Sequence, residues 1–183
     1  MKRLPANCPE WLQKKFLKNG GTISFHEYMN IVLNDSLEGY YGSGKAKLGI
    51  KGDFVTSPSM SDDFSFFLAM QIMQWVKQIL NGLKINKTLT ILEFGSGDAS
   101  LIKGIIDYFF KNEKNILQKV SFVLIEINKG MIDKQRDNLS GFIDKGVDIS
   151  WSDFNDLGDQ SINGIIIAHE VLVAFPVERI QYL

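Results

Sequence analysis

The chain has 183 residues, 45% hydrophobic and 22% charged, a composition typical of a globular protein rather than a disordered one. Its formal net charge of −1 provides no field that would attract nucleic acid or an anionic membrane, so we expect neither as a partner. One cysteine, Cys8, and two histidines exclude an internal disulfide and give no reason to expect a metal.

The N-terminus and the apolar runs predict a cytoplasmic location. Residues 1–5 begin with basic side chains, but no apolar stretch follows them, so they do not resemble a secretory signal. The longest apolar runs, such as residues 162–168, are too short to cross a bilayer.

The first 80 residues carry helix signals on either side of one long loop. A short helix is expected over residues 9–18, and Ser24 with Glu27 has the spacing of a capping box that opens a helix to about residue 33. Residues 34–60 contain five glycines, and a loop of that length is usually functional or mobile. Ser61 is a candidate N-cap for a helix to about residue 80. We expect that helix to be largely buried and to place its large apolar residues in the core; they are Phe64, Phe66, Phe67, Met70, Met73 and Trp75.

After residue 88 the pattern changes to short β-branched runs that alternate with amphipathic segments. Strands are expected at residues 90–94, 120–126, 147–151 and 162–168, and helices at residues 100–110 and 131–139. This alternation predicts an α/β fold with a parallel sheet. Such sheets bind ligands at the carboxyl ends of their strands, which directs attention to the residues that follow each strand.

A glycine-rich turn follows the first predicted strand, with the sequence Glu93-Phe94-Gly95-Ser96-Gly97. Its glycines allow a tight turn and a close approach of the backbone to a ligand. A dinucleotide loop would have a third glycine where this chain has Ser100, and Glu93 would repel a diphosphate. The same carboxylate suits the ammonium and sulfonium cations of S-adenosyl-L-methionine. A tight turn that binds no ligand is the alternative.

Acidic side chains follow the next strands. Glu126 ends the second strand, where a carboxylate can accept hydrogen bonds from both ribose hydroxyls of a nucleoside, although an ordinary strand-end acid would look the same. Asp153 is placed to contact an adenine amino group, with Phe154 near the ring. His169 and Glu170 follow the fourth strand; Glu170 can hold a guanidinium or amine, whereas a histidine there is more often structural.

These pieces together resemble the MidA family of S-adenosyl-L-methionine-dependent methyltransferases, which includes a mitochondrial complex I assembly factor that methylates a protein arginine. The most distinctive stretch is Gly52-Asp53-Phe54-Val55-Thr56-Ser57-Pro58. The others are Ile23-Ser24-Phe25 with Tyr28-Met29, Glu38-Gly39-Tyr40-Tyr41, the glycine turn, Leu124-Ile125-Glu126-Ile127, His169-Glu170 and Ala174-Phe175-Pro176-Val177. The resemblance implies a class I methyltransferase fold, Rossmann-like with about four strands, and a helical N-terminal cap that folds over the cofactor. It implies S-adenosyl-L-methionine as cofactor, bound by Glu93, Gly95, Ser96, Gly97, Glu126, Ile127, Asp153 and Phe154 together with Gly52, Asp53, Thr56 and Pro58 of the cap.

The resemblance also implies a division of the chain and a reaction. Residues 1–87 would form the cap and residues 88–183 the cofactor domain. This domain would be partial, because family members are about twice as long as this chain. The intact relative would transfer a methyl group to a protein nitrogen, that of an arginine guanidinium, with Glu170 and His169 as catalytic residues. The family usually has Asn and Asp where this chain has His169 and Val173. These departures keep open a binding or assembly protein without turnover, and an NAD-dependent oxidoreductase is the remaining alternative.

The expected strand order, 3-2-1-4, leaves the fourth strand at an open edge. An apolar edge strand is prone to pair with another chain, so self-association is expected there, beside a protein substrate as the main partner.

Overall fold

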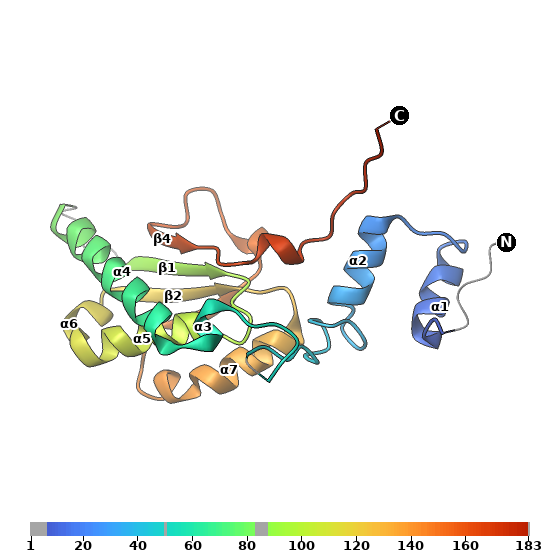
Figure 1. The fold of residues 1–183 in the computed structure, drawn as a ribbon. Helices are drawn as coiled ribbons and strands as arrows, with labels where there is room; N and C mark the ends of the chain where they lie inside the picture. The colour runs from blue at the N-terminus through green and yellow to red at the C-terminus, as the bar shows by residue number, and fades with distance from the viewer. Residues whose placement is uncertain (1–6, 50, 83–87, 183) are drawn as a thin grey trace.

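A computed structural model describes residues 7–49, 51–82 and 88–182 of the chain (Figure 1). Helices α1 (Glu10–Lys18) and α2 (Phe25–Asn34) come first, and a loop then leads to α3 (Ser57–Met60) and the long α4 (Asp62–Gly82). The alternating part comprises β1 (Leu89–Phe94), α5 (Ser100–Asn112), α6 (Lys114–Leu117), β2 (Val120–Ile125), α7 (Lys129–Ile143), β3 (Ile149–Ser152) and β4 (Gly164–Ile167), with 3-10 turns at Phe154–Asp156 and Leu172–Ala174. The predicted alternation is therefore confirmed. The predicted domain boundary at 87/88 adjoins the residues outside this description and stays a prediction.

The four strands form one parallel sheet in the order β3-β2-β1-β4, as expected. Leu92 of β1 lies opposite Val123 of β2 and Ile166 of β4. Helices α4, α5 and α7 lie along one face of the sheet (Figure 1). In the described part of the chain β4 pairs with β1 alone, and its Ile166 side chain is 58% exposed. No helix among the described residues is long and apolar enough to span a membrane.

The core lies between the sheet and the helix layer. Helix α5 buries one continuous stripe, which consists of Leu101, Ile102, Ile105, Ile106 and Phe109. Their spacing of one, three and four residues places them on one helical face, and Phe109 meets Phe122 of β2 edge to face with ring centroids 6.1 Å apart. The stripe fixes α5 across the sheet and thereby fixes the turn between β1 and α5.

Helix α4 buries different side chains from those that the sequence predicts. Of the six large apolar residues that were expected in the core, Met73 is buried, whereas Phe64, Phe66, Phe67, Met70 and Trp75 are 37–67% exposed. The buried face of α4 is instead built from smaller residues, Ser65 and Ala69, followed by Ile72, Met73 and Val76. Small side chains let α4 approach α5 closely, and this close approach turns the large ones outward.

The segment before α3 is tied together by local hydrogen bonds. The predicted capping box is present, with Glu27 N–H donating to Ser24 Oγ and Ser24 N–H to Glu27 Oε2. Asp35 Oδ1 then accepts from the amides of Leu37 and Glu38 at 3.0 Å each. Its other oxygen lies 2.7 Å from Lys15 Nζ, and this hydrogen bond lowers the pKa of Asp35 to about 2. The loop is therefore anchored at its start.

The close approach of α4 to α5 gives a test of the packing. A Cβ on Gly104 of α5 would lie 2.2 Å from Ser65 Oγ and 2.5 Å from Ser65 Cβ. We expect Gly104→Ala to lower the free energy of unfolding by about 1–3 kcal/mol, because the helices must separate. Gly141→Ala on α7, where a Cβ meets nothing within 4 Å, should raise it by about 0.5–1 kcal/mol. Urea unfolding of both variants at unchanged m-value measures this; stabilisation by Gly104→Ala would contradict the packing.

Candidate functional site

The turn after β1 has a backbone that favours glycine at two positions. Gly95 and Gly97 have φ angles of +59° and +55°. A Cβ on Gly95 would lie 2.5 Å from Val171 Cγ2, and one on Gly97 would lie 2.9 Å from Leu48 Cδ1. The turn is thus held between an apolar side chain from the loop before α3 and another from the segment after β4.

Glu93 is an acid inside the core strand that leads into this turn. It is 3% exposed, and burial raises the pKa of its carboxyl from 4.5 to about 7; the nearby Ser96 hydroxyl and Ile102 amide oppose this rise, and the Asp98 carboxylate adds to it. Glu93 Oε2 and the buried Ser96 Oγ have no hydrogen-bond partner within the described part of the chain. Buried polar atoms are normally paired, so these two fit a polar or cationic ligand group.

Glu126 follows β2 and is half-buried. Its Oε1 accepts from the Asn128 amide at 2.9 Å, and its Oε2 accepts from Gln135 Nε2 at 3.2 Å. Burial raises the pKa of Glu126, and these hydrogen bonds oppose the rise. Burial also raises the pKa of the Tyr41 hydroxyl, with the Glu126 charge as a second cause, so the loop before α3 lies close to this carboxylate. A carboxylate has about four acceptor positions, and two remain for a ligand hydroxyl pair.

The residues predicted after β2 and β3 are placed as follows. Ile127 is 63% exposed beside Glu126. Asp153 Oδ1 accepts from the backbone and side-chain amides of Asn155 at 2.8 and 2.9 Å, and so it caps the 3-10 turn that contains Phe154. The Phe154 ring is 60% exposed and lies 5.7 Å from the Phe94 ring. An exposed aromatic face therefore stands next to the glycine turn.

The residues after β4 differ in exposure. The His169 ring is half-buried and lies 5.2 Å from the Phe64 ring of α4. Glu170 is exposed and has φ +54°, an uncommon conformation for a residue with a side chain. Strained residues of this kind cluster at functional sites, and next to Val171 this one adjoins the glycine turn.

The residues predicted to form a cap over the cofactor lie in the loop before α3 and in α3 itself. Gly52 lies against the backbone of Lys47, and a Cβ there would meet the Lys47 carbonyl oxygen at 2.1 Å. Asp53 Oδ2 accepts from Tyr40 Oη at 2.7 Å, and burial followed by this hydrogen bond raises the pKa of Tyr40 to about 12. Thr56 accepts the Met60 amide through its carbonyl, and Pro58 lies in α3. Gly52 and Asp53 therefore shape the loop that reaches the glycine turn through Leu48.

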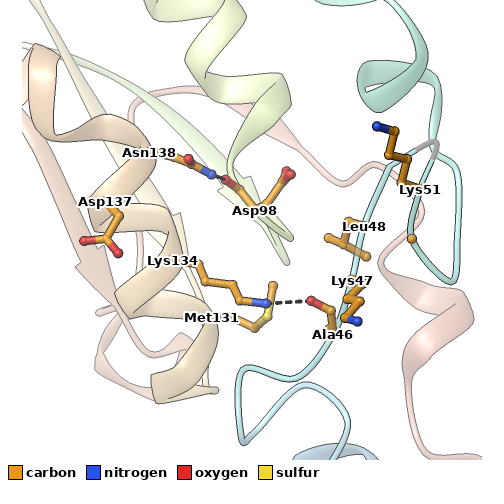
Figure 2. A pocket seen from close by; sticks show the side chains of 10 residues that line it. Ala46, Lys47, Leu48, Lys51, Asp98, Met131, Lys134, Asp137 and Asn138 are labelled. Carbon is orange, nitrogen blue, oxygen red and sulfur yellow. Dashed lines mark hydrogen bonds between the residues drawn. The ribbon is translucent and has the colours of Figure 1, made fainter.

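A cavity of about 450 Å³ lies between this loop and α7 (Figure 2). Lys134 Nζ crosses to the Ala46 carbonyl at 2.6 Å, and Asn138 Nδ2 donates to the Asp98 carbonyl at 2.7 Å. The lining comprises Ala46, Lys47, Leu48, Lys51, Gly52, Asp98, Met131, Lys134, Asp137 and Asn138. None of the strand-end acids Glu93, Glu126 and Asp153 lines this cavity, so it is separate from the predicted cofactor contacts of these acids. No group of three or more potential metal ligands occurs among the described residues.

Helix α7 supplies the site residues that were not predicted. Gln135 is fully buried and joins Glu126, the Gly97 carbonyl and Trp151 through hydrogen bonds. The sequence carries a signal for it, because Met131, Gln135 and Leu139 are spaced by four and share one face. An amide in the middle of an apolar stripe must find polar partners.

Comparison with known proteins identifies the fold and the family. Residues 67–183 match the family described as "Putative S-adenosyl-L-methionine-dependent methyltransferase". A crystal structure of a Burkholderia thailandensis superfamily member bound to S-adenosyl-homocysteine is similar with a TM-score of 0.69 and 26% identity, over 95% of this chain and 46% of that one. A second, native structure of a protein from the same superfamily and organism gives 0.65 and 26%, over 96% and 44%. The predicted class I methyltransferase fold is confirmed.

Curated relatives are similar along most of the chain. The mitochondrial protein arginine methyltransferase NDUFAF7 of Homo sapiens is 30% identical over 90% of this chain and 40% of its own length. Its Caenorhabditis elegans homologue is 28% identical over 91% and 42%. The chain thus spans about two fifths of the length of the curated relatives that it matches.

These relatives correct one expectation. The predicted cytoplasmic location is contradicted, because the matched relatives are named as mitochondrial proteins. That expectation was based on the composition of residues 1–5 and on the apolar runs, and the composition of a folded domain does not encode its compartment. The resemblance to the MidA family is confirmed by the same matches together with the family model. With residues 67–183 matched and the sheet order observed, this chain belongs to the family of S-adenosyl-L-methionine-dependent methyltransferases.

Proposed function

We propose that the chain binds S-adenosyl-L-methionine at the carboxyl ends of β1, β2 and β3 and forms the cofactor-binding part of a protein arginine methyltransferase. The observation that carries this proposal is the buried Glu93 carboxyl, whose Oε2 has no hydrogen-bond partner among the described residues and lies beside a glycine turn at positive φ. Glu93 would hold the cationic end of the cofactor, Glu126 the ribose, and Asp153 with Phe154 the adenine. Ser96, Ile127 and the cap residues Gly52, Asp53, Thr56 and Pro58 would complete the enclosure. The cofactor supplies an electrophilic methyl group on a sulfonium.

The matched relatives support an arginine acceptor, since they are named as protein arginine methyltransferases. Glu170 supports it chemically, because an exposed carboxylate next to the glycine turn can hold a guanidinium through two charge-assisted hydrogen bonds. The His169 ring lies against the Phe64 ring, and from this position it would line the part of the site that receives the acceptor. Self-association through the edge of β4 stays a prediction.

Substitution in the glycine turn tests the cofactor site. We expect Gly95→Val to abolish calorimetrically detectable binding of S-adenosyl-L-methionine and S-adenosyl-homocysteine, because the side chain would collide with Val171 and close the turn. Gly146→Val is the matched control: Gly146 also has a positive φ, +80°, but a Cβ there meets nothing within 4 Å. The control should be less stable than the unaltered chain but should still bind both ligands. Binding of NAD instead of the adenosyl ligands by the unaltered chain would reverse the proposal.

The raised pKa of Glu93 predicts a pH dependence. A cation binds the ionised carboxylate, so affinity for S-adenosyl-L-methionine should fall by up to about tenfold per unit as the pH drops below about 7. In the free protein, the pH dependence of stability has the opposite sign to that of ligand affinity. The pKa of Glu93 is higher in the folded than in the unfolded chain, so the free energy of unfolding falls as the pH rises from 4.5 to about 7. Titrations between pH 5.5 and 7.5 measure the affinity. Glu93→Gln should bind weakly with a flat profile; a profile parallel to that of the unaltered chain would remove Glu93 from the site.

The role of Glu170 is tested by separating binding from transfer. Glu170→Gln keeps the shape but removes the charge, so we expect cofactor affinity within about twofold and methyl transfer to arginine reduced about hundredfold. Transfer is measured as labelled methylarginine in hydrolysed acceptor protein. If the unaltered chain binds the cofactor yet transfers nothing, the chain alone is a binding protein. The exposed Val173, where the family usually has Asp, is the observation that favours this second function.

A further inference from the structure

Gln135 is a buried amide on α7 whose three hydrogen bonds reach the ends of three different strands. Its Nε2 donates to the Gly97 carbonyl at 2.9 Å, in the turn after β1, and to Glu126 Oε2 at 3.2 Å, after β2. Its Oε1 accepts from Trp151 Nε1 of β3 at 2.8 Å. The side chain is 0% exposed. One residue therefore joins the segments on which the proposed adenosine site is built.

The chemistry of the three partners fixes the orientation of the amide. An indole N–H can only donate, and a backbone carbonyl can only accept, so Oε1 must face Trp151 and Nε2 must face Gly97. The second N–H of Nε2 is then left for the Glu126 carboxylate. Glutamate at this position would have no donor and would repel Glu126, whereas an apolar residue would leave three partly buried polar groups without this partner.

We propose that Gln135 is a positioning residue of the cofactor site. It sets the Glu126 carboxylate at a fixed place relative to the glycine turn, and it holds the end of β3, two residues before Asp153, in the same frame. The inference depends on the proposed function, because it assigns Gln135 to the ribose and adenine contacts made by these residues.

The surroundings of Gln135 distinguish positioning from simple packing. Met131 and Leu139 lie one turn before and after it on the same face and are 2% and 0% exposed, so apolar side chains fill this interface well. A further partner of Glu126, the Asn128 backbone amide, is two residues away and cannot relate the carboxylate to the glycine turn. The bond from Gln135 also lowers the pKa of Glu126 against the effect of burial, and so favours the ionised acceptor.

The test compares Gln135→Met, which keeps the volume, with Leu139→Ala, which weakens the core one turn away. Three ligands are titrated into folded protein: S-adenosyl-homocysteine, adenosine and 2′,3′-dideoxyadenosine. We expect Gln135→Met to bind S-adenosyl-homocysteine about tenfold more weakly or worse. It should also lose the preference for adenosine over its dideoxy analogue. Leu139→Ala should keep the preference and stay within about twofold in affinity. Equal losses in the two variants, or full affinity in Gln135→Met, would overturn the proposal.

A second measurement requires no ligand. The Trp151 indole N–H should exchange slowly with solvent in the unaltered chain and faster in Gln135→Met, while the indole of Trp75, which is 43% exposed, serves as the internal reference. Unchanged exchange at Trp151 would show that the network is absent. If Gln135→Met does not fold, Trp151→Phe removes one of the three bonds and should lose part of the adenosine preference. If the unaltered chain binds none of the adenosyl ligands, the proposed function itself is wrong.

Discussion

Parallel pairing of β1 with both β2 and β4 is the constraint on which the rest of the molecule depends. Because the three strands run in the same direction, the acids that end β1 and β2 and the His169-Glu170 pair after β4 emerge at one edge of the sheet. The turn after β1 must then reverse the chain into α5 within a few residues, and this requires positive φ at Gly95 and Gly97. Close packing of α4, α5 and α7 on one face leaves that edge free for a ligand.

Local patterns predicted the elements well, because their causes are local. The capping box at Ser24, the β-branched strands and the glycine turn each depend on residues a few positions apart. The strand order and the family followed from the motifs in sequence. The contacts that the sequence did not reveal join residues far apart along the chain: Ser65 and Gly104 are separated by 39 residues, and nothing local shows that the small face of α4 meets α5 there.

Two residues show where sequence reasoning ends. Phe67 is apolar and lies in an apolar helix, yet it is 67% exposed, since burial is decided by which face a neighbour takes. Gln135 is polar and lies in a helix with polar neighbours, yet it is completely buried, because partners at the carboxyl ends of β1, β2 and β3 satisfy its amide. In both cases the hydrophobicity of a residue type predicts its average burial, and the tertiary contacts decide whether the particular side chain is buried.

The donors of α7 share a feature with a consequence for how the family can diverge. Lys134, Gln135 and Asn138 donate to the backbone carbonyl oxygens of Ala46, Gly97 and Asp98. A carbonyl is present whatever residue occupies the position. The loops that contain these carbonyl groups can therefore change their side chains during evolution while their hydrogen bonds to α7 persist. A substitution in the loops then requires no matching substitution in α7.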